Sequence, residues 1–223
     1  MHIPDGILTG PMIIMWFVIA IIFIAIGAQI IVKKRKENPT VISILALMGA
    51  GVFIISFWHI PVVLPGIAGS AHPTGTGLAA IIIGPFATVV VTVIALFFQV
   101  FLGHGGITSL GANTVSMGVV GAFSGYGVYW VARKLHASFW LSAGLAGFVS
   151  DMLTYATTSF QLALNQSYSL YQSPSYLFPY FTLYMIGFSF VQIPIAIIEF
   201  VFTAITIQYI VTHKPEILKW WHE

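Results

Sequence analysis

The sequence predicts an all-α integral membrane protein with seven transmembrane helices, its N-terminus outside and its C-terminus in the cytoplasm. Of the 223 residues, 58% are hydrophobic and only 6% are charged, whereas soluble domains carry about 25% charged residues. Residues 38–132 contain no Asp, Glu, Lys or Arg. A basic cluster, Lys33-Lys34-Arg35-Lys36, follows the first apolar run. Because basic loops stay in the cytoplasm, this cluster places Met1 outside.

Composition also excludes several classes of function. The chain has no cysteine, so disulfides, thiolate metal sites and cysteine nucleophiles are excluded. A net charge of +2 offers no basic groove for nucleic acid, and lipid is the expected surrounding. No basic region precedes the first apolar run, which is too long for a cleavable signal peptide. We therefore expect a single membrane domain over residues 1–223 with Met1 as the mature N-terminus.

Apolar segments define the predicted crossings. Read as one helix, residues 77–102 would put the later basic pair, Arg133 and Lys134, outside. Gly84-Pro85 removes this conflict, because proline blocks helix continuation and disfavours helical geometry in the residue before it. The predicted crossings are therefore residues 11–32, 41–58, 74–83, 85–102, 111–132, 138–160 and 180–211.

The third crossing is too short to span the membrane by itself. About ten helical residues cover only ~15 Å, so the preceding loop must dip into the membrane. Non-helical backbone at that depth is tolerated only where protein or a cavity covers it. Residues 59–76, rich in proline and glycine, are therefore predicted to form an outer pocket loop.

The first ten residues, MHIPDGILTG, have the donors of a metal chelator. The Met1 amine, the His2 amide nitrogen and the His2 imidazole Nδ1 would close a five-membered and a six-membered ring. Three nitrogens at three corners of a square favour Ni(II) or Cu(II). Ile3 precedes proline and is pushed to an extended backbone, and Pro-Asp-Gly favours a turn. Residues 1–10 thus form a candidate metal-binding finger, unless His2 is only an exposed terminal histidine.

A fourth nitrogen would come from one of three histidines in the outer loops. His72 is favoured because it lies among small residues, in GSAHPTG, just before the short third segment. His59 follows Trp58 at a helix end and is expected at the membrane interface. His104, in a glycine-rich loop, is a candidate gate or transient ligand, although a role on the loop surface is favoured.

Four motifs resemble a known family: MHIPDG at the N-terminus, the GSAHPTG loop, GPF, and GGITSLGANTVSMGVVGA. Together with the seven-helix layout, they resemble the CbiM/NikM family, the substrate-binding (S) components of energy-coupling-factor importers for cobalt and nickel. The resemblance implies one extra N-terminal helix added to a six-helix S-component bundle. It also implies metal ligands at Met1, His2 and His72. His104 departs from the family, which has Asp in a GDGG motif.

The resemblance also implies partners. The chain lacks G-x-x-x-x-G-K-[ST], so it has no P-loop to hydrolyse ATP and is not expected to be an enzyme. The family supplies a transmembrane coupling subunit and two ATPase subunits, with a small accessory membrane subunit in some cases. Ala46, Gly49 and Ala50 give the second helix a face of small residues. This face could dock the coupling subunit or simply pack inside the chain.

Other polar residues are candidates for supporting the ligands. Ser70 lies in the same loop as His72, and Asn113 could either hold the finger or cap a helix. Asp5 could orient the finger for metal binding or serve only as a turn residue in Pro-Asp-Gly, and the turn role is favoured. Asp151 and Glu199 are intramembrane acids and therefore functional candidates, but the sequence assigns them no role.

The sequence thus predicts a subunit that captures Ni2+ or Co2+ outside and delivers it across the membrane, without choosing between the two metals. One alternative is a membrane metalloenzyme, disfavoured because HExxH and cysteine are both missing. The other is a secondary transporter or channel, disfavoured because the membrane segments carry few charges.

Overall fold

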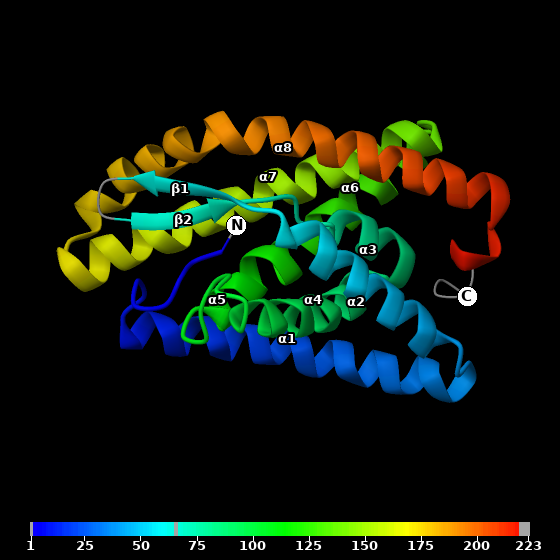
Figure 1. Cartoon of the computed structure of the whole chain (residues 1–223), viewed down its shortest axis with the longest axis horizontal. Helices are drawn as coiled ribbons and strands as arrows, with labels where there is room; N and C mark the ends of the chain where they lie inside the picture. The colour runs from blue at the N-terminus through cyan, green and yellow to red at the C-terminus, as the bar shows by residue number, and fades with distance from the viewer. Residues whose placement is uncertain (1, 65–66, 219–223) are drawn as a thin grey trace.

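The computed structural model describes residues 2–64 and 67–218 of the chain (Figure 1). Within these described residues, eleven helical segments follow the predicted crossings and their connections, and two strands lie between the second and third helices. The elements are α1 (Gly10–Glu37), α2 (Val41–Phe57), β1 (Ile60–Leu64), β2 (Ile67–Ala71), α3 (Thr76–Ile83), α4 (Pro85–Val100), α5 (Leu110–Asn113), the π-helical η1 (Thr114–Gly121), α6 (Ala122–Lys134), α7 (Phe139–Asn165), the π-helical η2 (Gln166–Leu170), the 3₁₀ turn η3 (Pro174–Tyr176) and α8 (Leu177–His213).

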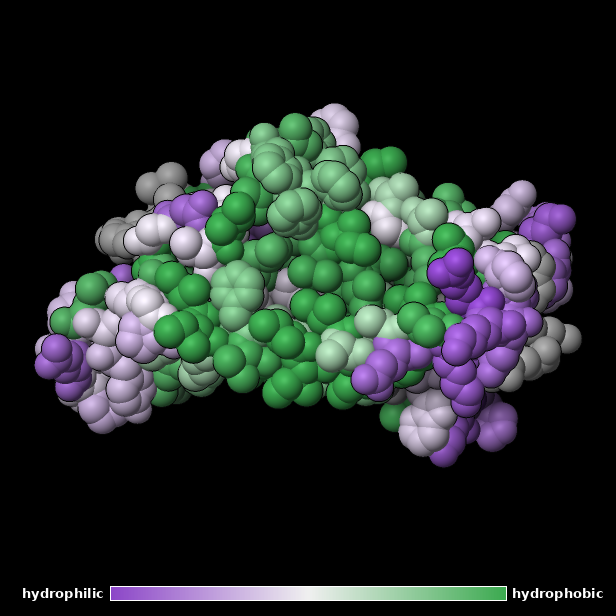
Figure 2. Space-filling model, turned by 90° about the horizontal axis from the view of Figure 1, so that it is seen from below, coloured by the Kyte–Doolittle hydropathy of each residue, from purple (hydrophilic) through white to green (hydrophobic). Residues whose placement is uncertain are grey.

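The outer surface of the bundle is apolar, as lipid contact requires. Figure 2 shows a hydrophobic band across the middle of the molecule with hydrophilic residues at both ends. Large apolar side chains point outward along it, including Ile14 and Phe190, which are 67% and 79% exposed. Three helical segments in the described chain are long and apolar enough to span a membrane: Gly10–Glu37, Leu110–Lys134 and Pro174–His213. The number of crossings and their orientation stay predictions.

The predicted break at Gly84-Pro85 is confirmed. Helix α3 ends at Ile83, Gly84 adopts φ 72° and ψ 157°, and α4 begins at Pro85. All eight residues of α3 are buried. A side chain on its second residue, Gly77, would place a Cβ 2.9 Å from the Ala146 carbonyl of α7. The glycine therefore lets the short helix lie directly against α7, at the centre of the bundle.

The loop predicted for residues 59–76 is largely a β-hairpin, which the sequence analysis missed. Strands β1 and β2 pair antiparallel, with Ile60 opposite Ala71 and Val62 opposite Gly69. The hairpin satisfies its backbone groups internally, which a non-helical segment needs where water is scarce. The hairpin also holds the end of β2 in place, and the 72–76 segment continues from there into the interior.

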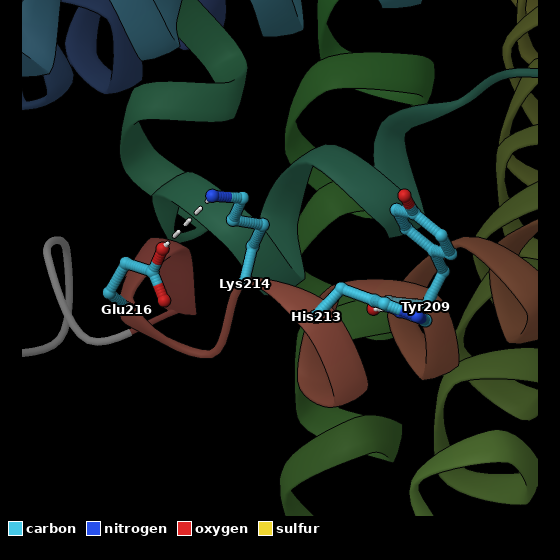
Figure 3. A network of polar contacts seen from close by, with 4 residues as sticks. All are labelled: Tyr209, His213, Lys214 and Glu216. Carbon is cyan, nitrogen blue, oxygen red and sulfur yellow. Dashed lines mark hydrogen bonds and ion pairs between the residues drawn. The ribbon is translucent and has the colours of Figure 1, made fainter.

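The two ends of the bundle differ. At one end lie the hairpin, the start of α1 and the connection from α7 to α8 (Figure 1, left), and at the other lie the α1–α2 turn and the end of α8. There Lys214 and Glu216 form an exposed ion pair at 4.0 Å, which adds little stability (Figure 3). His213 stacks on Tyr209 with ring centroids 4.3 Å apart.

Candidate metal centre

The N-terminal finger is held as an extra strand beside the hairpin. His2 makes an antiparallel bridge with Ser70 of β2, so β2 has β1 on one edge and the finger on the other. Ser70 therefore contributes its backbone to positioning His2. This arrangement places His2 next to the segment that leads to His72.

Asn113 clamps the following residue of the finger. Its Oδ1 accepts from the Ile3 N–H at 2.9 Å, and its Nδ2 donates to the Ile3 carbonyl at 3.2 Å. The Ser109 hydroxyl also donates to this carbonyl. The Asn113 side chain thus binds both backbone polar groups of Ile3, as the backbone of a neighbouring strand would. Asn113 ends α5 and precedes η1, and its side chain makes no capping hydrogen bond to η1.

Asp5 fastens the finger to the 103–109 loop. Its carboxylate accepts from the Thr108 hydroxyl at 2.6 Å, from the Thr108 N–H at 2.8 Å and from the Ile107 N–H at 3.2 Å. The Thr108 hydroxyl is the main cause that lowers the pKa of Asp5. Farther along, the Asn165 side chain accepts from the Thr9 N–H and donates to the Ile7 carbonyl, both at 2.9 Å. The finger is therefore anchored at both its turn and its base.

His72 lies directly after β2 with its ring fully buried. Its Nδ1 lies 2.8 Å from the Pro73 carbonyl, so Nδ1 carries the proton and donates. Nε2 is then an acceptor, and among the described residues it has no partner. Histidines that bind metals usually donate their other N–H to a carbonyl or carboxylate. His72 has this arrangement.

The His2 and His72 rings stack with centroids 4.2 Å apart. His2 is 3% exposed and His72 is 0% exposed, and within the described chain neither nitrogen of His2 has a hydrogen-bond partner. Burial lowers the pKa of both imidazoles well below the usual value, so both are neutral and able to bind a cation at neutral pH. Unpartnered buried nitrogens call for an explanation, and a metal bound at the edges of the two rings, where the nitrogen lone pairs lie, would supply one.

The described side chains form only part of a coordination sphere. No group of three or more His, Asp or Glu side chains that could hold a metal occurs in residues 2–64 and 67–218. Met1, the third predicted ligand residue, lies outside the described residues. The described side chains therefore offer two imidazoles and no third side-chain ligand beside them.

A network of buried polar side chains contacts the backbone around His72. The sequence alone predicted no role for its two acids, Asp151 and Glu199. The Glu199 carboxylate accepts from the Thr74 N–H at 2.7 Å and from the Thr74 hydroxyl and the Gly75 N–H, both at 2.8 Å. Gln192 Nε2 donates to the Asp151 carboxylate at 2.7 Å and to the His72 carbonyl at 3.2 Å. These residues of α7 and α8 therefore fix the backbone on both sides of Pro73, and so the direction of the His72 ring.

The other two outer histidines lie against each other, and both are half-buried. The His59 and His104 ring centroids are 3.9 Å apart, and the Phe57 ring is 4.9 Å from His104. Neither belongs to the His2–His72 stack. No sequence pattern pairs them, because the two histidines are 45 positions apart in the chain.

The small residues of α2 line an apolar groove. Ala46, Gly49 and Ala50 face it together with residues of α1 and α4, and its volume is about 780 Å³. Gly49 also approaches α4, since a Cβ there would lie 3.7 Å from Val91. This face therefore takes part in packing within the chain and also leaves room on the lipid side.

We expect Asn113→Ala to weaken metal binding roughly tenfold, because the buried Ile3 N–H loses its acceptor at a cost of about 1–3 kcal/mol. The melting temperature should change little, since only the terminal segment is released. Calorimetric titration with Ni2+ measures the loss. Asn38→Ala, at the far end of α1, is the matched control and should bind like the parent. Unchanged affinity in Asn113→Ala would show that the clamp does not position His2.

The chain is similar over nearly its whole length to a known family of membrane proteins. The family model for the cobalt uptake substrate-specific transmembrane region, CbiM, matches residues 2–217. The "Cobalt transport protein CbiM" of Sorangium cellulosum is 38% identical over 219 residues, covering 98% of this chain and 94% of that protein. Its namesake in Thermosipho melanesiensis is 39% identical over 213 residues, covering 94% and 86%.

Solved structures agree as well. A crystal structure of a truncated transition metal transporter superposes with a TM-score of 0.81 at 28% identity, covering 96% of this chain and 99% of that one. A second transition metal transporter superposes with the same TM-score at 27% identity, covering 95% and 93%. The predicted multi-pass membrane location is confirmed. This chain belongs to the CbiM family of cobalt-uptake membrane proteins.

Proposed function

We propose that this chain is the substrate-binding subunit of an energy-coupling-factor importer, and that it captures Ni2+ or Co2+ on the outer face of the membrane. One observation carries the proposal: His2 and His72 stack in a closed interior, and three of their four ring nitrogens have no partner among the described residues. Family membership supports metal import, because the relatives are named as cobalt transport proteins.

The proposed ligands are the Met1 amine, the His2 amide and imidazole nitrogens, and His72 Nε2. Residues 1–10 would supply three donors and the 59–76 segment the fourth. Nitrogen donors suit both metals, and at a given site nickel binds more tightly than cobalt. Because the imidazoles are neutral at rest, a cation would compete with few protons on them. Asn113, Asp5 and the backbone of Ser70 would keep the donors in place.

Release of the ion would require movement of the finger. Its anchors lie on the hairpin, on the 103–109 loop and on α7, so a change in how these parts pack would pull the donors apart. We propose that the whole subunit reorients on a transmembrane coupling subunit, and that two ATPase subunits supply the energy. The groove lined by Ala46, Gly49 and Ala50 is the proposed docking face, because small residues let a neighbouring membrane helix approach closely.

The alternatives have less support. A membrane metalloenzyme needs an open coordination position near substrate, whereas His2 and His72 are closed off from solvent. A secondary transporter or channel needs a pathway across the membrane that is lined by polar or charged groups. The buried acids Asp151 and Glu199 instead bond to Gln192 and to the Thr74–Gly75 backbone, which suits a structural role.

The test is uptake of radioactive Ni2+ and Co2+ into cells that lack other importers for these metals. We expect uptake only when the chain is expressed with its coupling and ATPase subunits, and loss of uptake when the ATPase nucleotide site is inactivated. Co-purification of the ATPase subunits with the chain is the second measurement. Uptake by the chain alone that persists after ATP depletion would favour the secondary transporter.

A further inference from the structure

A second pair of imidazoles lies next to the closed metal centre. His59 follows α2 and His104 lies in the loop after α4, and their ring centroids are 3.9 Å apart in an edge-to-face arrangement. Both residues are half-buried, so the pair is open to solvent where His2 and His72 are not. Imidazole is a good ligand for divalent transition metals, and with the rings this close each can turn one nitrogen toward a single cation.

Each ring has a nitrogen to offer. His59 Nδ1 lies 3.2 Å from the Phe57 carbonyl, and by donating there it leaves Nε2 as an acceptor. His104 Nδ1 is buried and, among the described residues, has no partner. The His104 backbone is fixed, because its N–H donates to the Gln99 carbonyl at 3.0 Å. Like the inner stack, the outer pair therefore has unpaired ring nitrogens, and hydrogen bonds hold the His59 ring and the His104 backbone in place.

The outer pair is connected to the inner one through the 103–106 loop. A Cβ on Gly105 would lie 3.4 Å from His2 Cδ2 and 3.2 Å from Asn113 Nδ2, so the backbone of Gly105 lies over the His2 ring. Gly103 and Gly105 both have positive φ values, 79° and 76°, which suit glycine and allow local rearrangement. His104 stands between these two glycines. His104 is therefore the sequence neighbour of a residue that lies against both His2 and Asn113.

We propose that His59 and His104 form a second, weaker metal site for the same divalent cations, from which the inner site is loaded. Two imidazoles completed by water bind less tightly than four protein nitrogens, three of them in one chelate. Such a site would fill and empty quickly. The existence of the site rests on the geometry of the pair, and its loading role rests also on the proposed function of the inner site.

Equilibrium dialysis of the purified full chain against Co2+ alone tests the site. In a His72→Ala background, in which the inner site is weakened about a hundredfold, we expect about one weakly bound equivalent beyond what the weakened inner site retains. Adding His59→Ala and His104→Ala should weaken it at least tenfold, which corresponds to about 1.4 kcal/mol. The matched control adds His136→Ala and His213→Ala, two exposed histidines, and should retain the weak equivalent. Equal binding in both triple variants would overturn the proposal.

The loading role is measured separately by stopped-flow mixing of the otherwise unchanged chain with Co2+. His59→Ala with His104→Ala should slow filling of the inner site several-fold and leave its equilibrium affinity within about twofold. Unchanged filling would refute loading even if the weak site exists. Absence of tight binding in the parent chain would instead refute the proposed function, so the two failures are distinct. Melting temperatures of all variants establish that each is folded.

Discussion

An N-terminal tag is expected to abolish tight binding of Ni2+ or Co2+ while the protein still folds and inserts. Any extension converts the Met1 amine into an amide and removes one of the four proposed donors. His2 and Ile3 are only 3% and 1% exposed, so added residues would have to find room in a closed interior. The helices do not depend on the tip of the finger, and the melting temperature without metal should stay within a few degrees.

Calorimetric titration of native, N-tagged and C-tagged chains measures this effect. The C-terminal tag is the control, because the end of α8 lies at the opposite end of the bundle with Lys214 and Glu216 exposed (Figure 3). The C-tagged form should bind like the native chain. If the N-tagged form, with its tag shown to be intact, binds metal as well as the native chain does, the amine is not a ligand.

His72→Ala is expected to lower the affinity of the tight site by about a hundredfold or more, equal to about 2.7 kcal/mol. The reason is the loss of one donor, with no other imidazole placed to replace it: His59 and His104 pair with each other. A ligand at 100 times its dissociation constant raises stability by about 2.7 kcal/mol. Saturating metal should therefore raise the melting temperature of the parent chain and leave that of His72→Ala almost unchanged.

His213→Ala is the matched control for this substitution, since His213 is exposed and stacked on Tyr209 away from the site (Figure 3). It should bind metal and gain stability like the parent. A His72→Ala chain with the same metal-dependent rise in melting temperature as His213→Ala would show that His72 is not a ligand.

Local rules were enough to locate the helices. Long apolar runs, the basic cluster after α1 and the Gly84-Pro85 break are readable one segment at a time, because helix formation depends on neighbouring residues. The hairpin was missed although IPVVLPGIAGSA contains β-branched residues and a Pro-Gly turn signal. Strand-like residues flank that dipeptide on both sides, but proline and glycine in the same segment also favour a loop, which is what was predicted before the short helix.

The proposed ligand residues were easier to single out from the sequence than the residues that contact them. His2 stood out because of its place beside the N-terminal amine, and His72 because of the small residues around it and the resemblance to a family. The Glu199 contact with Thr74 joins residues 125 positions apart in the chain. No spacing rule connects them, and only the packing of α8 against the 72–76 segment brings them together. The same holds for His59 and His104.

Nickel K-edge X-ray absorption of the purified chain, loaded with one equivalent of Ni2+ and with an unmodified N-terminus, tests the central claim most directly. The account predicts four nitrogen donors in a square plane, with the scattering pattern of two imidazoles, and loss of one imidazole contribution in His72→Ala. A six-coordinate shell of oxygen donors without imidazole scattering would contradict it. The metal would then bind elsewhere, and the His2–His72 stack would be packing alone.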